Sequence, residues 1–174
     1  MMKNVLKQSY ALYALLVSSE EVQYLQLGDE LPGFNEDYSV CSMSSDGTTV
    51  VVGTPYNDGN EVNSGHVQVH AYNGSQWNQV GDDMYGESAG VQSGYAVSIS
   101  DNGNIIAIEK RYNGTGQVRV YSYDGSLWDR GWGLFGFAIS TSPNGMLVAI
   151  GMPRNHGDDN QGGQVAVYSF DGSE

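Results

Sequence analysis

Basic residues and cysteine are what this sequence has least of. Its 174 residues contain seven Lys and Arg against 20 Asp and Glu, a formal net charge of −13. Because phosphate binding needs clustered basic side chains, this balance argues against nucleic acid and against anionic membrane surfaces as partners. The single cysteine, Cys41, excludes an intrachain disulfide framework and a zinc site built on several thiolates.

Helical periodicity is missing as well. After residue 20, no run of ten or more residues repeats apolar side chains at helical spacing. Hydrophobic residues nevertheless make up 40% of the chain, which is enough to build a core. The sequence therefore favours a folded, all-β protein.

Residues 1–19 differ in composition from the rest. Lys3 and Lys7 precede a short apolar run at residues 11–17, and small residues lead up to Glu20. This arrangement predicts a secretory signal peptide cleaved before Glu20, and hence a secreted or cell-surface protein. The run is shorter than the roughly 20 residues that span a bilayer, so no membrane insertion is expected. A short amphipathic helix, or an arbitrary start of a truncated gene, is the alternative.

One pattern occurs three times at intervals of about 50 residues. The motif Gly-x-Val-x-Val stands at residues 65–69, 116–120 and 163–167, and an aromatic residue and an Asn-Gly-Ser or Asp-Gly-Ser turn follow each copy. Before each motif, another Asn-Gly or Asp-Gly joins two apolar stretches. These dipeptides favour tight hairpins, because type I′ turns need positive φ at both central residues.

Each unit is therefore interpreted as four strands, a to d, with tight a–b and c–d turns and a longer b–c loop. Four short strands every 40–50 residues are typical of a β-propeller blade. We predict an all-β domain at residues 20–174, made of three four-stranded antiparallel repeats that form a partial β-propeller. The repeat units are residues 24–76, 77–127 and 128–174.

Several short motifs point to a known family. Phe135-Gly136 followed by Gly151-Met152-Pro153 resembles the FG-GAP repeat of integrin-α-like propellers, and residues 53–55 supply a second Gly-x-Pro. The tail at residues 77–86 is similar to a variant found in secreted repeat proteins of microbes and algae, and residues 24–33 match it. The resemblance covers residues 24–174 and implies a propeller used for adhesion, ligand binding or scaffolding.

The chain departs from that family in two places. Calcium-binding members carry several Asp and Asn in the a–b turn, whereas the turns at residues 45–47, 101–103 and 143–145 hold at most one carboxylate each. No metal and no other cofactor is therefore expected. The middle repeat replaces Gly-x-Pro by Glu109-Lys110-Arg111, which we interpret as drift at an exposed strand end rather than as a specificity patch.

Isolated residues suggest chemistry only weakly. Ser88 lies in a Gly-x-Ser-x-Gly match, but no helix is predicted after it, as a nucleophile elbow requires. His66 and His70 share one face of a strand about 13 Å apart, too far to bind one metal, which favours a packing role. His156 is a lone loop histidine. Cys41 is interpreted as a buried thiol at a β-bulge. No catalytic, cofactor-binding or metal-binding residue is predicted.

Acidic residues gather on one predicted face. The b–c loops and d–a connectors of a blade share a face, called here the loop face, and the loop face holds 11 of the 20 carboxylates. They are Asp29, Glu30, Glu36, Asp37, Asp58, Glu61, Asp82, Asp83, Glu87, Asp158 and Asp159. We interpret them as a solubilising surface rather than a cation site. Asn73 and Asn113 begin glycosylation sequons, and Asn73 also fits as a turn residue.

The combined interpretation is a non-catalytic, secreted or cell-surface binding scaffold that holds a protein or glycan ligand on its loop face. The alternatives are a fragment of a larger propeller protein and a glycan-active hydrolase of propeller type. The chain begins with a strand-d pattern at residues 22–28 and its last unit stops after strand c. A homodimer that completes a six-bladed ring by exchanging this strand is therefore predicted.

Overall fold

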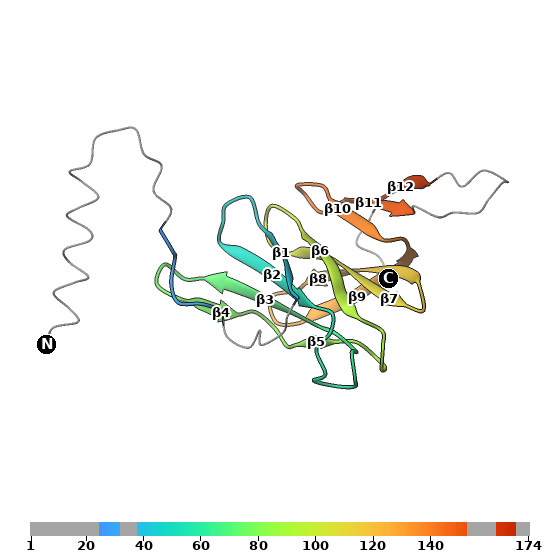
Figure 1. Cartoon of the computed structure of the whole chain (residues 1–174). Helices are drawn as coiled ribbons and strands as arrows, with labels where there is room; N and C mark the ends of the chain where they lie inside the picture. Colours follow the sequence, from blue (N-terminus) through green and yellow to red (C-terminus); the bar gives the residue numbers. More distant parts are fainter. Residues whose placement is uncertain (1–24, 32–37, 153–162, 170–174) are drawn as a thin grey trace, which may run out of the picture.

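The computed structural model describes residues 25–31, 38–152 and 163–169, and within them the regular structure consists of strands in three antiparallel sheets (Figure 1). The prediction of an all-β, antiparallel fold is confirmed. The sheets contain five, four and three strands, so they are not three identical four-stranded units. No helix among the described residues has the length and apolar character needed to cross a membrane.

The strands follow the chain in order within each sheet. Sheet 1 consists of β1 (Val40–Met43), β2 (Thr49–Thr54), β3 (His66–Tyr72), β4 (Trp77–Gln79) and β5 (Met84–Tyr85), the last pairing with β3. Sheet 2 consists of β6 (Ser93–Ile99), β7 (Ile105–Tyr112), β8 (Thr115–Tyr123) and β9 (Trp128–Phe135). Sheet 3 consists of β10 (Ala138–Thr141), β11 (Leu147–Met152) and β12 (Gln164–Ser169).

The first hairpin of every sheet is closed in the same way. Gly47, Gly103 and Gly145 have φ of 72°, 73° and 72°, a conformation that glycine adopts without steric penalty. A serine hydroxyl before each turn accepts a hydrogen bond from the backbone N–H five residues later, at 2.9–3.0 Å. The tight a–b turns predicted from Asp-Gly and Asn-Gly are therefore present in all three sheets. They are not type I′ turns, because Asp46, Asn102 and Asn144 do not share the positive φ of the glycines that follow them.

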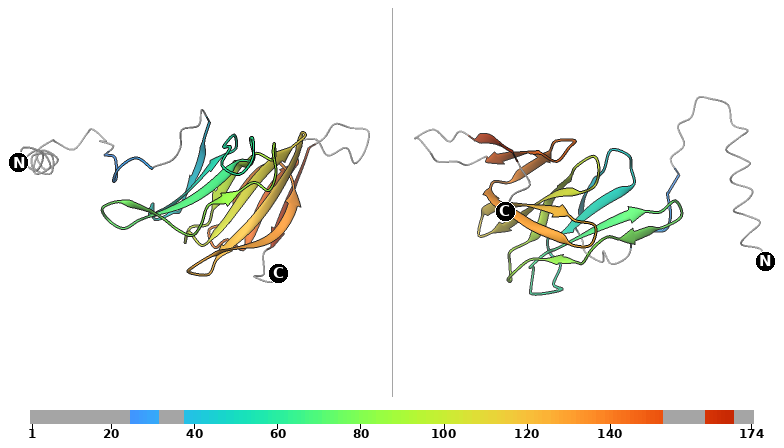
Figure 2. Two further views of the ribbon diagram at one scale, coloured as in Figure 1. Left: turned by 90° about the horizontal axis from the view of Figure 1, so that it is seen from below. Right: turned by 180° about the vertical axis from the view of Figure 1, so that it is seen from behind.

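The apolar core lies between neighbouring sheets, which stack face to face (Figure 2). Between sheets 1 and 2 the buried side chains are Val51, Val67, Val69, Ile99, Ile106 and Ile108. Between sheets 2 and 3 they are Ala107, Val118, Val120, Val148 and Ile150. The valines of the Gly-x-Val-x-Val motif in one sheet thus contact the apolar strand-b residues of the next sheet.

A tryptophan at the start of strand d ties each unit to the unit before it. The Trp128 Nε1 donates to the Val80 carbonyl at 3.0 Å, and the Trp77 Nε1 donates to the Leu27 carbonyl at 2.9 Å. The following Gly81 and Gly28 have matching φ of 73° and 71°. Residues 25–31 therefore lie against sheet 1 as the end of β4 lies against sheet 2.

The expectation for Cys41 is wrong in both parts. β1 pairs with β2 in unbroken register from Val40 to Met43, so no bulge is present there, and the thiol is exposed. Register shifts lie instead in β6, between Ser93 and Ala96, and in the pairing of β8 with β9, between Arg119 and Tyr121. Residues 40–43 match residues 96–99 and 138–141 one for one in their pairing with strand b, so the paired part of β1 contains no extra residue.

Candidate functional site

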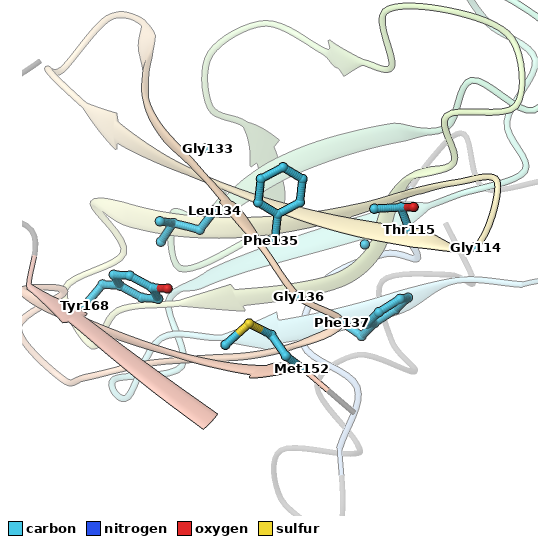
Figure 3. Close-up of a pocket in the computed structure, with 10 residues that line it drawn as sticks. Gly114, Thr115, Gly133, Leu134, Phe135, Gly136, Phe137, Met152 and Tyr168 are labelled. Carbon is cyan, nitrogen blue, oxygen red and sulfur yellow. The ribbon is translucent and has the colours of Figure 1, made fainter. Parts of the chain in front are cut away.

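An open pocket of about 710 Å³ lies on the loop face, between sheets 2 and 3 (Figure 3). Its lining comes from the β7–β8 turn and the start of β8, the end of β9, the β9–β10 connector, the end of β11, and β12. The lining residues are Gly114, Thr115, Gly116, Gly133, Leu134, Phe135, Gly136, Phe137, Met152 and Tyr168. Phe135 is 66% exposed and Tyr168 37% exposed, so two aromatic rings are available to a ligand.

The pocket exists because two connections are short. Between sheets 1 and 2, residues 86–92 connect β5 to β6 and form hydrogen bonds with the β2–β3 loop, including Gly90 N–H to the Val62 carbonyl at 2.9 Å. Between sheets 2 and 3, only Gly136 and Phe137 connect β9 to β10, and the β7–β8 loop is reduced to a tight turn. Because the β9–β10 connector and the β7–β8 loop are both short, the space between sheets 2 and 3 that corresponds to the one filled by residues 86–92 stays open.

Beside the pocket, aromatic rings from β6, from the β9–β10 connector and from segments next to β1 and β2 gather near one guanidinium. Tyr38, Tyr56 and Tyr95 have ring centroids 5.9–6.5 Å apart. The Arg111 guanidinium lies 3.6 Å from the Tyr95 ring centroid and 5.2 Å from that of Phe137. These five residues form what we call the aromatic–arginine cluster. Since Phe137 also lines the pocket, the cluster and the pocket form one continuous surface.

Glu109 holds Arg111 in this position. The Arg111 Nε donates to Glu109 Oε1 at 2.6 Å, and the Glu109 side chain is fully buried. Burial raises the pKa of Glu109, while the hydrogen bond and the charge of Arg111 oppose that rise. The interpretation of residues 109–111 as drift at an exposed strand end is therefore wrong for Glu109, whose counterparts in the other sheets are Gly53 and Gly151.

A second polar group is buried inside sheet 1. The His66 Nδ1 lies 3.3 Å from Thr54 Oγ1, its Nε2 lies 3.4 Å from Asp83 Oδ2, and its ring stacks on Tyr85. Burial tends to raise the pKa of Asp83, but hydrogen bonds from Gln68, Tyr85 and Gln79 outweigh it and lower that pKa. A Thr–His–Asp series suggests a nucleophile, but the Thr54 hydroxyl is fully buried and donates to the His66 carbonyl. This geometry makes it a structural group.

The other isolated candidates do not come together. Ser88 lies in an exposed turn that leads directly into β6. His70 is buried, its Nε2 lies 3.3 Å from Gln68 Oε1, and burial lowers its pKa. Both histidines are thus buried on the face of sheet 1 opposite to the one that packs on sheet 2. The part of the chain that the structure describes holds no group of three or more His, Cys, Asp or Glu suited to a metal ion. His156 lies outside the described residues.

Some loop-face carboxylates serve the fold itself. Asp58 accepts a hydrogen bond from the Asn63 N–H, and Glu87 forms two hydrogen bonds with Arg119 at 2.7 and 3.2 Å. Asp29, Glu30, Glu61 and Asp82 are exposed, while Glu36, Asp37, Asp158 and Asp159 lie outside the described residues. The acidic residues therefore do not act as one uniform surface.

Side-chain hydrogen bonds also occupy the a–b turns and the sequon turn. Asp46 accepts from the Thr48 N–H and from Ser44 Oγ, which lowers its pKa. Asn73 Oδ1 accepts from the N–H groups of Ser75 and Gln76, so it acts as the turn residue predicted for it. Asn73 and Asn113 are both exposed, and glycosylation of either stays a prediction.

No protein-family model matches the sequence, and neither does any curated protein. Among solved structures, a "putative 6-phosphogluconolactonase" from Bacteroides fragilis is similar, with a TM-score of 0.48 and 16% identity. The match covers 70% of this chain and 33% of that one, so this chain spans about a third of the neighbour's length.

Sequence reasoning missed the pocket and the aromatic–arginine cluster, although two signals for them exist. Ten residues lie between Tyr85 and Ala96, whereas only Gly136 and Phe137 lie between Phe135 and Ala138, the counterpart of Ala96 in sheet 3. The other signal is a buried-type strand end that carries Glu and Arg in place of Gly and Pro. Neither signal shows by itself which rings meet in space.

Proposed function

We propose that the three sheets are blades of a secreted β-propeller-type repeat protein of the FG-GAP kind, which binds a glycan on its loop face without catalysing a reaction. The order of strands within each sheet and the face-to-face stacking of the sheets support the propeller interpretation. The observation that carries the binding function is the open pocket lined by Phe135, Phe137 and Tyr168.

The chemistry of the pocket suits a sugar. Aromatic rings offer flat apolar faces to the C–H side of a sugar ring, and the Thr115 and Tyr168 hydroxyls among the lining residues can form hydrogen bonds with it. The net charge of −13 repels anionic ligands, so neutral or cationic glycans are favoured over acidic ones.

The same lining supports binding rather than hydrolysis. Glycosidases need a pair of carboxyl groups on either side of the scissile bond. The described lining residues contribute Gly, Thr, Leu, Phe, Met and Tyr side chains, and no carboxylate stands among them. Glu109 does not line the pocket, and its fully buried carboxylate is bound to Arg111.

A glycan array tests the function. Wild-type protein is compared with Phe135→Ala, which removes the most exposed ring of the pocket, and with Leu127→Ala, a matched apolar truncation at a 54% exposed residue of the β8–β9 turn. We expect Phe135→Ala to weaken binding at least tenfold, as loss of about 1.4 kcal/mol of contact would do, and Leu127→Ala to bind like wild type. Absence of binding by wild type, or equal binding by Phe135→Ala, would refute the proposal.

Secretion is proposed on the basic and apolar residues 1–19, which lie outside the described residues. The mature chain recovered from its native host should begin at or near Glu20. An intact Met1 on that protein would contradict export.

A further inference from the structure

The outer face of sheet 3, defined by Val165 and Val167, is exposed where the same face of the other sheets is buried. The register of strands b and c makes Val67, Val118 and Val165 equivalent, and likewise Val69, Val120 and Val167. Their exposed fractions run 0%, 0% and 75% for the first set and 1%, 3% and 63% for the second. Three copies of one motif therefore meet two different environments.

What covers this face elsewhere is visible in the protein itself. In sheets 1 and 2 the valines are covered by the apolar strand-b residues of the following sheet. Strand c is also covered along its edge, by β4 and β5 in sheet 1 and by β9 in sheet 2. In sheet 3, within the described residues, no strand pairs with the outer edge of β12. The face and the edge together match a strand d followed by another sheet.

Residues 25–31 have the complementary property, because they occupy the place of a strand-d end and belong to none of the sheets formed by the described residues. The Trp77 Nε1 hydrogen bond to the Leu27 carbonyl repeats that of Trp128 to Val80. In sheet 1, the Val80 N–H donates to the Val69 carbonyl at 2.8 Å. The counterpart of Val80 is Leu27, which is 56% exposed, and the counterpart of Val69 is Val167.

These two surfaces cannot meet within one chain. Residues 25–31 lie at one end of the stack of sheets, beside sheet 1, whereas β12 lies at the opposite end (Figure 2). We propose that the outer face of sheet 3 docks a second copy of this chain, whose residues 25–31 pair with β12 and place Leu27 beside Val167. Each copy offers both surfaces, so the contact forms twice and two copies close one ring. Neither the edge of β12 nor that of residues 25–31 then stays unpaired.

The outer face of sheet 1, which would lie against sheet 3 of the second copy, is exposed only in part, since Thr54, His66 and His70 on that face are 0%, 5% and 2% exposed. Met43 is 54% exposed, whereas its counterpart Ile99 in sheet 2 is 6% exposed beneath sheet 1. Val50 and Val52 of the same face are already buried, so the part of the face left open runs along β1. With each copy at −13, the association must rest on apolar contact, and added salt should strengthen it by screening the repulsion.

Disulfide trapping in the full-length chain tests the proposal. In a Cys41→Ser background, one variant carries Leu27→Cys with Val167→Cys, and the control carries Leu27→Cys with Leu127→Cys, a residue exposed to a similar degree on the β8–β9 turn. We expect a covalent dimer from the first pair on mild oxidation and none from the control. Light scattering on the unmodified chain should give twice the chain mass of 18.8 kDa.

Three results would overturn the proposal. They are a single-chain mass at every concentration tested, a growing ladder of multimers in place of a closed pair, and a dimer that the first cysteine pair fails to trap. None of these readouts involves a glycan, so they are separate from the test of the binding function.

Discussion

The three equivalent valines at the second motif position allow one perturbation to be made in three environments. Val69→Ala and Val120→Ala each remove two methyl groups from side chains that are 1% and 3% exposed, while Val167→Ala does the same at 63% exposure. Transfer of the two groups accounts for about 1.6 kcal/mol at a buried site. Incomplete collapse of the cavity raises the expected loss to about 2–3 kcal/mol.

At Val167 the loss of stability within a single chain should stay within about 0.5 kcal/mol, because most of the side chain is already in water. The assay is urea unfolding of wild type and the three variants, at a protein concentration where light scattering shows single chains. At concentrations where wild type is dimeric, Val167→Ala should instead weaken the dimer. An equal loss at all three positions in single chains would refute the reasoning, since it would mean that sheet 3 is covered within its own chain.

Two further predictions concern buried charge. Arg111→Met should destabilise the protein by about 3–5 kcal/mol at pH 7.5, because it leaves the fully buried Glu109 without its partner. In urea unfolding, the double variant with Glu109→Gln should recover most of this loss. A loss below about 1 kcal/mol for the single variant would show that solvent reaches Glu109. Burial lowers the pKa of His70 from 6.5, so as pH falls the unfolded chain binds the proton before the folded chain does. The stability that the neutral, buried His70 contributes is therefore lost as pH falls through 6.5. Wild type should therefore lose more stability between pH 7.5 and 5.0 than His70→Tyr, which installs the residue found at positions 121 and 168; equal losses would mean that His70 is hydrated.

The elements themselves could be predicted from the sequence because their causes are local. Asp46-Gly47, Asn102-Gly103 and Asn144-Gly145 define tight turns through the φ values that glycine allows, and each lies where the structure has the first hairpin of a sheet. The alternating Gly-x-Val-x-Val motif likewise predicted strand c in all three sheets. Side-chain periodicity and turn chemistry act over a few residues, so a single sequence reveals them.

Exposure and assembly of side chains were decided by tertiary structure. Val69 and Val167 occupy the same position of the Gly-x-Val-x-Val motif, yet only Val69 is buried, because the next sheet packs on it. The charged neighbours of Glu109 suggested a solvated strand end, but its side chain is fully buried and bound to Arg111, whose guanidinium lies against the rings of Tyr95 and Phe137. The sequence by itself determined turns, strands and the repeat; which faces are covered and which rings surround Arg111 depend on contacts between residues far apart in the chain, and only the folded stack of sheets sets those.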